Sequence, residues 1–303
     1  LGHSVAGAVS STWSEGHETA FEAFGVRIGV GTNDPRVWSR LDELVPPHSR
    51  PCGLGDVEHH FSVGTDEGTM VTVRYDVRNG VAAQPLDSGS YVASKVDLEL
   101  ALGLLDTHVQ SCLGLHAPEH IFIEAGAVAR NGRALLLPGK ALSGKTTLVA
   151  ALVRAGCVYY SDQYALLDER GRLHPYARPL SLPAQAQPET NAHGHVRAAI
   201  SSPDPLPIDA VVVTTYSPEA EWRPRHLSRG EGVTALLSHA VPGQHRTEEA
   251  MRAISRALEH EPIMLASPRG EADAVAPSLL AAVERRGSQP RAAHSTDHDA
   301  LYG

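Results

Sequence analysis

Short runs in which apolar and polar residues alternate occupy the first third of this chain, and longer helical periods lie between them. Alternation with a period of two predicts strands, and apolar residues spaced three or four apart predict helices. The elements that this pattern predicts are strands over residues 24–30, 60–63 and 70–75, and helices over 33–44 and 96–113. Together they predict a small α+β domain over residues 1–116, of which residues 1–20 are expected to be loosely ordered.

A second domain is predicted over residues 117–286, so that the whole chain belongs to the mixed α/β class. Two apolar runs flank Asn131-Gly132, a dipeptide typical of a hairpin turn, and the second run leads through a glycine-bearing turn into a helix. The predicted strands cover 121–129, 133–138, 158–161, 165–168, 172–174 and 208–216, and the predicted helices cover 146–155, 229–240, 247–259 and 271–285. Residues 183–207 are expected to form a long mobile loop, and residues 287–303 a disordered tail.

The glycine-bearing turn contains two of the three lysines in the chain, Lys140 and Lys145. The stretch from Gly139 to Thr147 reads GKALSGKTT and matches G-x-x-x-x-G-K-[ST], the phosphate-binding loop. A strand before the loop and a helix after it supply the context that this motif requires. The candidate nucleotide-binding residues are Gly139, Lys140, Ser143, Gly144, Lys145, Thr146 and Thr147.

Each residue type in this loop has a chemical reason. Glycines let the backbone turn tightly and direct its N–H groups at phosphate oxygens. Lys145 supplies a compact positive charge for the β and γ phosphates, and Thr146 offers a hydroxyl to Mg²⁺. The helix that follows directs its positive end at the same anion. The loop therefore predicts binding of ATP with Mg²⁺.

A metal ion beside phosphates requires a carboxylate, and Asp162 is the best candidate. It follows the apolar run 158–161 and lies 17 residues after Lys145. A parallel strand would place it at the sheet edge beside the loop, where it would bind Mg²⁺ together with Thr146. Asp168 and Asp209 are alternatives, but each lies in a predicted hairpin or at a predicted strand start.

Composition excludes some classes of partner. The formal net charge of −9 argues against nucleic acid as the main partner, because a surface that follows phosphates needs clustered positive charge. A membrane-spanning helix needs about 20 consecutive apolar residues, and no apolar run of this chain approaches that length. Three cysteines without CxxC spacing favour reduced thiols and a cytoplasmic location. The seventeen histidines are scattered, and we interpret most of them as surface residues, among them His59-His60, His193, His195, His239 and His245.

The hairpin strands, GKALSGKTT and the later segment AGCVYYSD together resemble the C-terminal domain of HPr kinase/phosphorylase, which shares its fold with phosphoenolpyruvate carboxykinase. The resemblance covers residues 117–182 and, more thinly, 208–285. It implies a P-loop kinase domain, with phosphates and Mg²⁺ on Lys145, Thr146 and Thr147, and it places the first residue of the family's Asp-Asp pair on Asp162. Relatives of this kind include kinases that modify ribosomal peptides such as lasso peptides, and HPr kinases assemble into rings, which implies a homo-oligomer.

Two positions depart from the family pattern. The second aspartate falls on Gln163, and the histidine on the strand before the loop is replaced by Glu124. A carboxylate can act as a general base, so Glu124 is a candidate for that work. The Glu-Ile-Arg-Gly signature of the family is absent, so the resemblance does not identify HPr as the acceptor.

These observations predict a phosphotransferase that moves the γ-phosphate of ATP to a hydroxyl group. The candidate catalytic residues are Asp162, Glu124 and Lys145, and one of Arg178, Arg197 and Arg225 is a candidate to neutralise the transferred group. A serine of a peptide or protein, or a small-molecule alcohol, fits as acceptor. The alternative is a nucleotide-binding regulator or scaffold without turnover, which the residues Gln163 and Glu124 favour.

Overall fold

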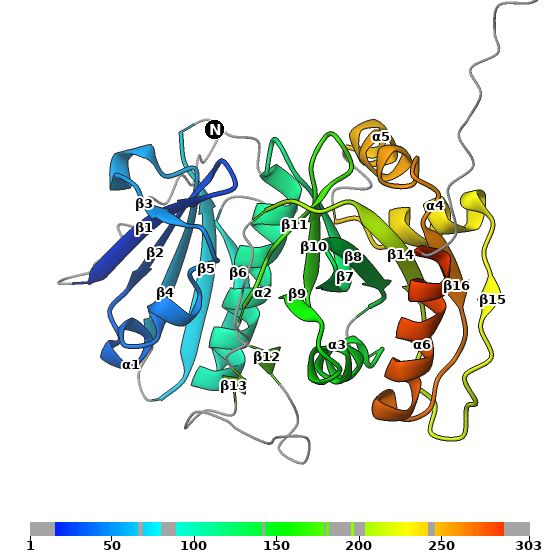
Figure 1. The fold of residues 1–303 in the computed structure, drawn as a ribbon. Coiled ribbons are helices and arrows are strands. Elements are labelled where there is room, and N and C mark those ends of the chain that lie inside the picture. Colours follow the sequence, from blue (N-terminus) through cyan, green and yellow to red (C-terminus); the bar gives the residue numbers. More distant parts are fainter. Residues whose placement is uncertain are drawn as a thin grey trace, which may run out of the picture. The chain divides into compact units, whose positions relative to one another are not determined.

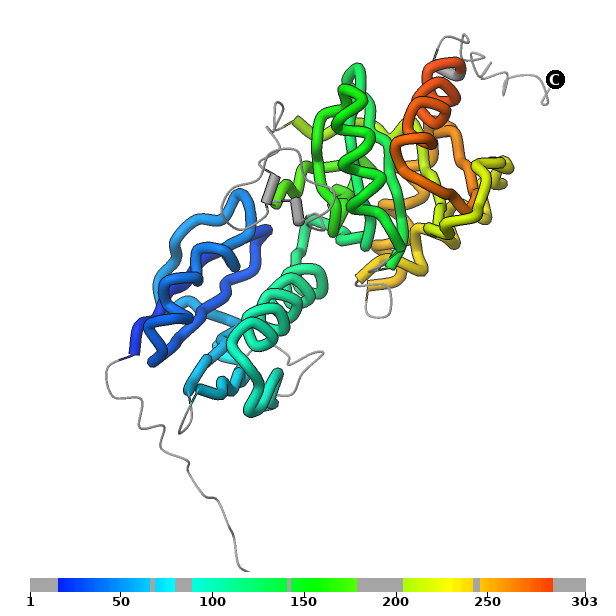
Figure 2. The backbone as a smooth tube through the Cα atoms, turned by 90° about the horizontal axis from the view of Figure 1, so that it is seen from below, coloured from blue at the N-terminus to red at the C-terminus, as the bar shows by residue number. Residues whose placement is uncertain are grey.

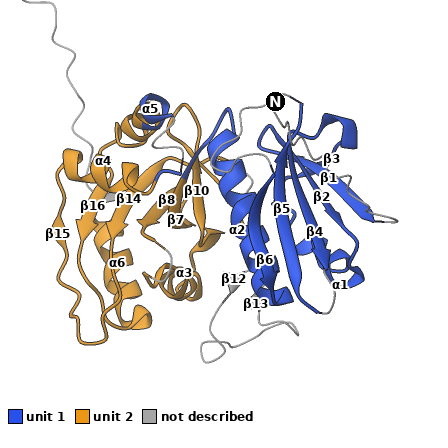
Figure 3. Cartoon of the chain, turned by 180° about the vertical axis from the view of Figure 1, so that it is seen from behind, with its two compact units in different colours: residues 1–122, 240–250 blue, residues 123–239, 251–303 orange. Residues whose placement is uncertain are grey.

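A computed structural model describes residues 16–65, 69–79, 89–140, 143–178, 180–181, 195–196, 204–241 and 246–287 of the 303-residue chain. Its described part is mixed α/β, with two large mixed sheets and six α-helices (Figure 1). The chain divides into two compact units, one of residues 1–122 with 240–250 and one of residues 123–239 with 251–303 (Figure 3). No helix in the described residues combines the length and the apolar character that a membrane span requires.

The first unit contains a six-stranded sheet in the order β3-β1-β2-β4-β5-β6. Its strands are β1 (His17–Ala23), β2 (Val26–Thr32), β3 (Arg50–Pro51), β4 (His59–Thr65), β5 (Val71–Val77) and β6 (Ser90–Val96). The β2–β4 pair is parallel and the other pairs are antiparallel. Helix α2 (Leu98–His116) begins at Asp97, whose side chain accepts a hydrogen bond from the N–H of Leu100, and packs on β5 and β6 (Figure 2).

The second unit contains the sheet order β11-β10-β7-β8-β14-β16-β15, with β9 also paired to β7. Its strands are β7 (Ile121–Arg130), β8 (Arg133–Pro138), β9 (Val158–Ser161), β10 (Tyr164–Leu167), β11 (Leu173–His174), β14 (Ile208–Val213), β15 (Arg225–His226) and β16 (Ile263–Ala266). A separate pair joins β12 (Leu180–Ser181) and β13 (His195–Val196). Strands β8, β14 and β16 run parallel, and β7 and β8 form the predicted hairpin.

One hydrophobic cluster of the second unit is formed by this sheet and two helices. Buried residues of α3 (Lys145–Arg154) and α6 (Ala272–Gly287) form one hydrophobic cluster with residues of β7, β8, β14 and β16. Helices α4 (Arg229–Leu237) and α5 (Thr247–Ala257) contribute no residue to that cluster. Packing of α3 fixes the direction in which its first turn points, because Leu148 to Leu152 are all buried. The loop that precedes α3 is therefore anchored at both ends.

Most of the predicted elements are present, with four corrections. Residues 17–20 are not loosely ordered, because they form β1 with β2 as its partner. The predicted helix over 33–44 is broken: α1 (Pro35–Trp38) ends at Ser39, and Arg40, with φ of −116°, precedes a separate 3₁₀ turn over Leu41–Glu43. Strands β6 and β16, and the two-residue strands β3, β12, β13 and β15, were not predicted from the pattern. Residues 1–15, most of the loop over 183–207 and the tail beyond Gly287 lie outside the described residues.

The fourth correction concerns the histidines. His59 and His60 were expected at the surface, but their exposed fractions are 1% and 6%. Adjacent residues of a strand point to opposite faces of the sheet, so β4 buries one ring on each side. Nδ1 of His59 lies 2.7 Å from the Tyr75 hydroxyl, and Nε2 of His60 lies 2.7 Å from Glu18. Each buried ring therefore has a hydrogen-bond partner, which offsets the free-energy cost of removing its nitrogen from water.

Candidate phosphate-binding site

The loop between β8 and α3 joins a buried strand to a buried helix over a few residues. Strand β8 ends at Pro138, and α3 begins at Lys145. The N–H of Gly139 donates to the carbonyl of Glu124 on β7 (3.1 Å), which fixes the start of the loop against the neighbouring strand. Ala141 and Leu142 lie outside the described residues. The strand and the helix that are expected on either side of a phosphate-binding loop are both present.

Gly144 is the loop position where glycine is required. Its φ of +86° lies in the left-handed region, which residues with a side chain rarely adopt. A Cβ atom built there would lie 2.6 Å from Nη2 of Arg269 and 3.0 Å from Cβ of Tyr216. Backbone conformation and close packing therefore both exclude a larger residue at this point of the motif.

Lys145 is half-buried at the first turn of α3, and its ammonium group points back into the loop. Its Nζ donates to the carbonyl oxygen of Lys140 (2.6 Å). Burial lowers the pKa of Lys145, while the negative charges of Glu124 and Asp162 act in the opposite direction. The two carboxylates named from the sequence thus act electrostatically on the same ammonium group.

Asp162 accepts hydrogen bonds from two hydroxyl groups, one of them from Thr146 in the first turn of α3. The Thr146 hydroxyl donates to one carboxylate oxygen of Asp162 (3.0 Å), and the Tyr159 hydroxyl donates to the other (2.8 Å). Asp162 is only 7% exposed, and burial raises its pKa, although both hydrogen bonds oppose the rise. The structure therefore brings together three residues that the sequence named: Lys145, Thr146 and Asp162. Tyr159 is a further hydrogen-bond partner of Asp162, which the sequence did not name.

Strand β9 carries Asp162 to the loop by a different pairing from the one expected. Its hydrogen-bonded neighbour is β7, and the two strands are antiparallel. Because β7 is also antiparallel to β8, strands β8 and β9 run in the same direction and end at the same edge of the sheet. The expected proximity of Asp162 to the loop thus arises without direct parallel pairing to β8.

Glu124 lies at a junction of backbone hydrogen bonds beside the loop. Its carbonyl holds Gly139, and its own N–H donates to the carbonyl of His239 (2.8 Å). The next residue, Ala125, donates its N–H to the carbonyl of Gln163 (3.1 Å). Strand β7 therefore connects the loop, the Asp162 turn and the segment after α4. The side chain of Gln163 is exposed, so only its backbone takes part in this junction.

His239 is a member of the site that sequence reasoning missed. Burial lowers the pKa of its imidazole. The negative charge of Glu124 raises this pKa, and the positive charges of Lys145 and Lys140 lower it further. Nδ1 of His239 is buried and has no hydrogen-bond partner among the described residues. No local signal distinguishes this histidine from the others in the chain, because it reaches the loop only through the end of α4.

Arg269 was also missed, although it is the largest fully buried side chain in the described residues. Its Nη2 donates to the carbonyl of Gly144 (2.6 Å) and its Nη1 to that of Gly270 (2.8 Å). The guanidinium lies over the ring of Tyr216, 5.5 Å from the centroid, and the Tyr216 hydroxyl donates to Glu271 (2.9 Å). Burial lowers the pKa of this arginine, which acts as a brace behind the loop.

Three arginines were proposed from the sequence to neutralise the transferred phosphoryl group, and the structure describes two of them. The carbonyl of Arg178 lies 2.9 Å from the Tyr159 hydroxyl, which donates to Asp162, so Arg178 lies near that carboxylate. Burial raises the pKa of Tyr159, and the positive charge of Arg178 opposes the rise. Arg225 forms an ion pair with Glu231 (2.8 Å) on strand β15, at the far edge of the sheet. Arg197 lies outside the described residues. Of the two arginines that the structure describes, Arg178 is therefore the candidate.

The two alternative carboxylates are engaged elsewhere. Asp168 accepts hydrogen bonds from the N–H groups of Arg170 and Arg172 and lies 3.0 Å from His174, so it organises the β10–β11 turn. Asp209 forms an ion pair with Arg133 (3.2 Å) at the start of β14, whereas the loop follows the end of β8. A cavity of about 460 Å³ also lies at that far end, lined by Asn131 and Arg133 among others.

Comparison with known proteins gives no family for this chain. No protein-family model matches it, and no curated protein matches it significantly.

We expect Arg269→Met to weaken nucleotide binding by about 10-fold or more. Methionine fills a similar volume but leaves the Gly144 carbonyl without its donor, so the loop is held less firmly in its binding conformation, and a loss of about 1.4 kcal/mol of binding free energy is a 10-fold loss of affinity. Isothermal titration calorimetry with ATP and Mg²⁺ measures the effect. Arg223→Met, at an exposed arginine of the same unit, is the control. Unchanged affinity for ATP in Arg269→Met would show that Arg269 does not hold the loop for nucleotide binding.

Proposed function

We propose that this protein is an ATP-dependent kinase that transfers the γ-phosphate to a hydroxyl group of a peptide, a protein or a small alcohol. The observation that carries this proposal is the convergence of Lys145, Thr146 and Asp162 at one end of the sheet, beside a loop with phosphate-binding spacing. A P-loop domain of the HPr kinase type is the fold that we propose for residues 117–286.

The spacing of Thr146 and Asp162 suits Mg²⁺. Neighbouring ligands of an octahedral Mg²⁺ ion, at 2.0–2.1 Å from the metal, lie about 2.9 Å apart. The oxygens of Thr146 and Asp162 are 3.0 Å apart, so both can bind one ion with little rearrangement. Hydroxyl and carboxylate oxygens are also the hard ligands that this ion prefers. When bound, Mg²⁺ would supply positive charge that offsets the charge of the phosphates.

The loop itself suits a polyphosphate. The ammonium group of Lys145 is bonded to a loop carbonyl, so an incoming phosphate can take over that donor without a change of the helix. The Ser143 hydroxyl is buried and has no partner among the described residues, so it supports binding of an anion in the loop. Main-chain N–H groups at the start of α3 add the favourable end of the helix dipole.

In this proposal the chain contributes position and charge. Lys145 neutralises the β and γ phosphates, and Asp162 with Thr146 holds the metal ion. Glu124 orients the acceptor hydroxyl and accepts its proton, and Arg178 neutralises the transferred group. Phosphoryl transfer depends mainly on such positioning and electrostatic stabilisation. Arg269 and Tyr216 keep the loop in place without contact to the reacting atoms.

We expect Glu124→Gln to lower kcat about 100-fold or more, the usual contribution of a general base, with little change in ATP affinity. Glutamine keeps the shape of the side chain and removes only its ability to accept a proton. Steady-state kinetics with a competent acceptor measures the effect, and Glu169→Gln, at an exposed glutamate of the same unit, is the control.

The variant His239→Asn distinguishes between Glu124 and His239 as the general base. We expect this variant to keep most of its turnover, because the neutral imidazole shapes the surroundings of Glu124. A fully active Glu124→Gln together with an inactive His239→Asn would transfer the role of base to His239.

The second candidate function is nucleotide binding without turnover. Gln163 favours this function, because the HPr kinase family that the chain resembles has a second aspartate at this position, and here the residue is an exposed glutamine. Incubation with γ-labelled ATP and a panel of peptides and small alcohols, read by mass shift, distinguishes the two. Transfer to any acceptor supports the kinase. Tight ATP binding without transfer across the panel supports the regulator.

A further inference from the structure

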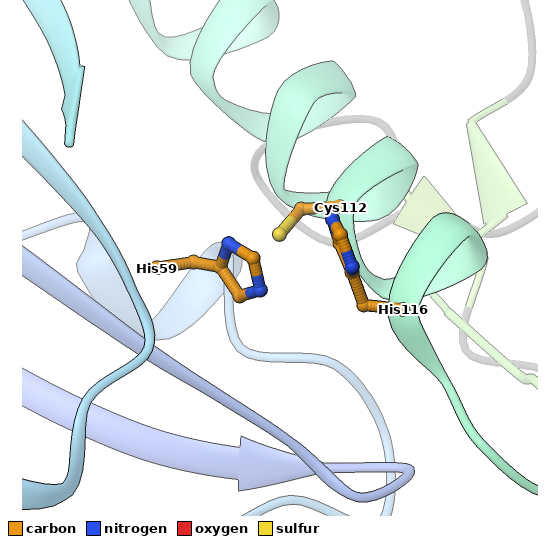
Figure 4. Close-up of side chains that lie close together, drawn as sticks. All are labelled: His59, Cys112 and His116. Carbon is orange, nitrogen blue, oxygen red and sulfur yellow. The ribbon is translucent and has the colours of Figure 1, made fainter. Parts of the chain in front are cut away.

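We propose that the first unit contains a zinc site formed by His59, Cys112 and His116. The site belongs to the compact unit that does not carry the phosphate-binding loop. One ligand atom from each residue lies within 4.8 Å of the others, and Figure 4 shows the three side chains pointing toward one another. Sequence alone gave no reason to connect these residues.

The fold brings these residues together from two elements. Cys112 and His116 are four residues apart on α2, so their side chains lie on the same face of the helix, one turn from each other. His59 is the first residue of β4, and its ring lies against that of His116, with centroids 4.3 Å apart. A cation bound by all three would fasten the end of α2 to the sheet.

The chemistry of the three ligands selects the metal. A thiolate and two imidazoles suit Zn²⁺, whereas Mg²⁺ and Ca²⁺ prefer oxygen ligands. In a tetrahedral zinc site the ligand atoms lie about 3.3–3.6 Å apart, given Zn–N of 2.0–2.1 Å and Zn–S of 2.3 Å. The ligand atoms here lie within 4.8 Å of one another, so zinc binding would draw them up to about 1.5 Å closer by rotation of the side chains.

The surroundings of His59 fit a ligand role. The Tyr75 hydroxyl lies 2.7 Å from Nδ1 of His59, which fixes the ring and leaves Nε2 as the nitrogen available to a cation. Metal-bound histidines commonly have such a partner on the second ring nitrogen. His59, Cys112 and Tyr75 are 1%, 4% and 2% exposed, so the site is shielded from competing ligands. Half-buried His116 provides the approach from solvent.

Metal content of the full-length protein tests the proposal. After purification without chelators and dialysis against micromolar Zn²⁺, we expect about one equivalent of tightly bound zinc. Substitution with Co²⁺ should give the near-ultraviolet thiolate-to-cobalt band and visible bands typical of a tetrahedral ion. Removal of zinc should lower Tm, because a ligand that binds only the folded state stabilises it. Less than one-tenth of an equivalent, or no thiolate band, overturns the proposal.

Variants then assign the ligands. Cys112→Ser, His59→Gln and His116→Gln should each lower zinc affinity by more than 10-fold and abolish the cobalt thiolate band or shift the visible bands. Tyr75→Phe should lower the affinity about 10-fold to 100-fold, as loss of an outer hydrogen bond to a metal ligand does. His116→Gln is at a half-buried position and is the variant most certain to fold, which circular dichroism checks.

Two matched controls accompany these variants. Cys157→Ser removes a buried thiol from the second unit, and His108→Gln removes a half-buried histidine from α2 one turn before Cys112. Both should keep full zinc content and the cobalt spectrum. Retention of the thiolate band in Cys112→Ser, or its loss in Cys157→Ser, would contradict the assignment.

Discussion

Lys145→Ala will reduce phosphoryl transfer by about 10³-fold or more, because one well-placed cation at the transferring group is worth that much. Neither of two other cations of the described residues replaces this ammonium group: Lys140 is exposed, and the guanidinium of Arg269 is bonded to the carbonyls of Gly144 and Gly270. The variant should also lose most of its affinity for ATP. Kinetics with a competent acceptor, together with calorimetry of ATP binding, measures both losses.

The loop supplies its own control for this experiment. Lys140→Ala removes the other lysine, which the sequence named as a nucleotide-binding candidate but whose side chain is exposed; only its backbone carbonyl receives the Lys145 ammonium group. We expect it to retain most of the activity. Thermal unfolding should be nearly unchanged in Lys145→Ala, since the variant loses one hydrogen bond of about 1 kcal/mol and relieves the burial of a charge. Full turnover in Lys145→Ala would remove the loop from the mechanism.

Asp162→Asn should give a protein that is more stable and much less active. Asparagine cannot supply the charge that holds Mg²⁺, so we expect kcat to fall about 10²-fold or more and the Mg²⁺ dependence to weaken. ATP affinity measured without Mg²⁺ should change little. A kinetic series over Mg²⁺ concentration, with affinity measured separately, shows whether the loss lies in the metal-dependent step.

The stability part of this prediction follows from the raised pKa of Asp162. Between its ordinary value of 3.8 and its higher folded value, the folded protein binds more protons than the unfolded chain. The free energy of unfolding of the metal-free protein therefore falls as pH rises through this range. Asp162→Asn removes the dependence and should raise Tm at neutral pH, which scanning calorimetry measures at several pH values.

Asp168→Asn is the matched control, because its linkage has the opposite sign. Burial opposes ionisation of Asp168, but the hydrogen bonds from His174 and from the N–H of Arg172 lower its pKa overall. Its carboxylate contributes stability above pH 3.8 that is lost as pH falls through the lower folded value. This variant should lose stability at neutral pH and keep its activity. Lower stability in Asp162→Asn would contradict the role of burial at that carboxylate.

Sequence reasoning found the parts of the site that lie close together along the chain. Loop spacing identified Lys145 and Thr146, and the apolar run before Asp162 located the carboxylate that contacts Thr146. The hairpin into the loop was equally visible, since Asn131-Gly132 separates two apolar runs. These features depend on local backbone conformation and strand direction, which a single segment of sequence encodes.

Residues that reach the site from distant segments were not found. Arg269 contacts the Gly144 carbonyl across 125 positions, and His239 joins Glu124 through a backbone hydrogen bond at the end of α4. Only tertiary packing determines such pairs. The Pro268-Arg269-Gly270 sequence directly after β16 is the one local sign that the arginine occupies a special position. His59 was misjudged for the same reason, because its partners are on α2 and β5.

A crystal structure with a non-hydrolysable ATP analogue and Mg²⁺ would show whether this loop binds the phosphates of ATP. We expect phosphate oxygens at the N–H groups of residues 143–147, the Lys145 ammonium group on the β and γ phosphates, and Mg²⁺ at about 2.1 Å from the Thr146 hydroxyl with Asp162 beside it. An analogue bound elsewhere, with Lys145 still bonded to the Lys140 carbonyl, would contradict this expectation.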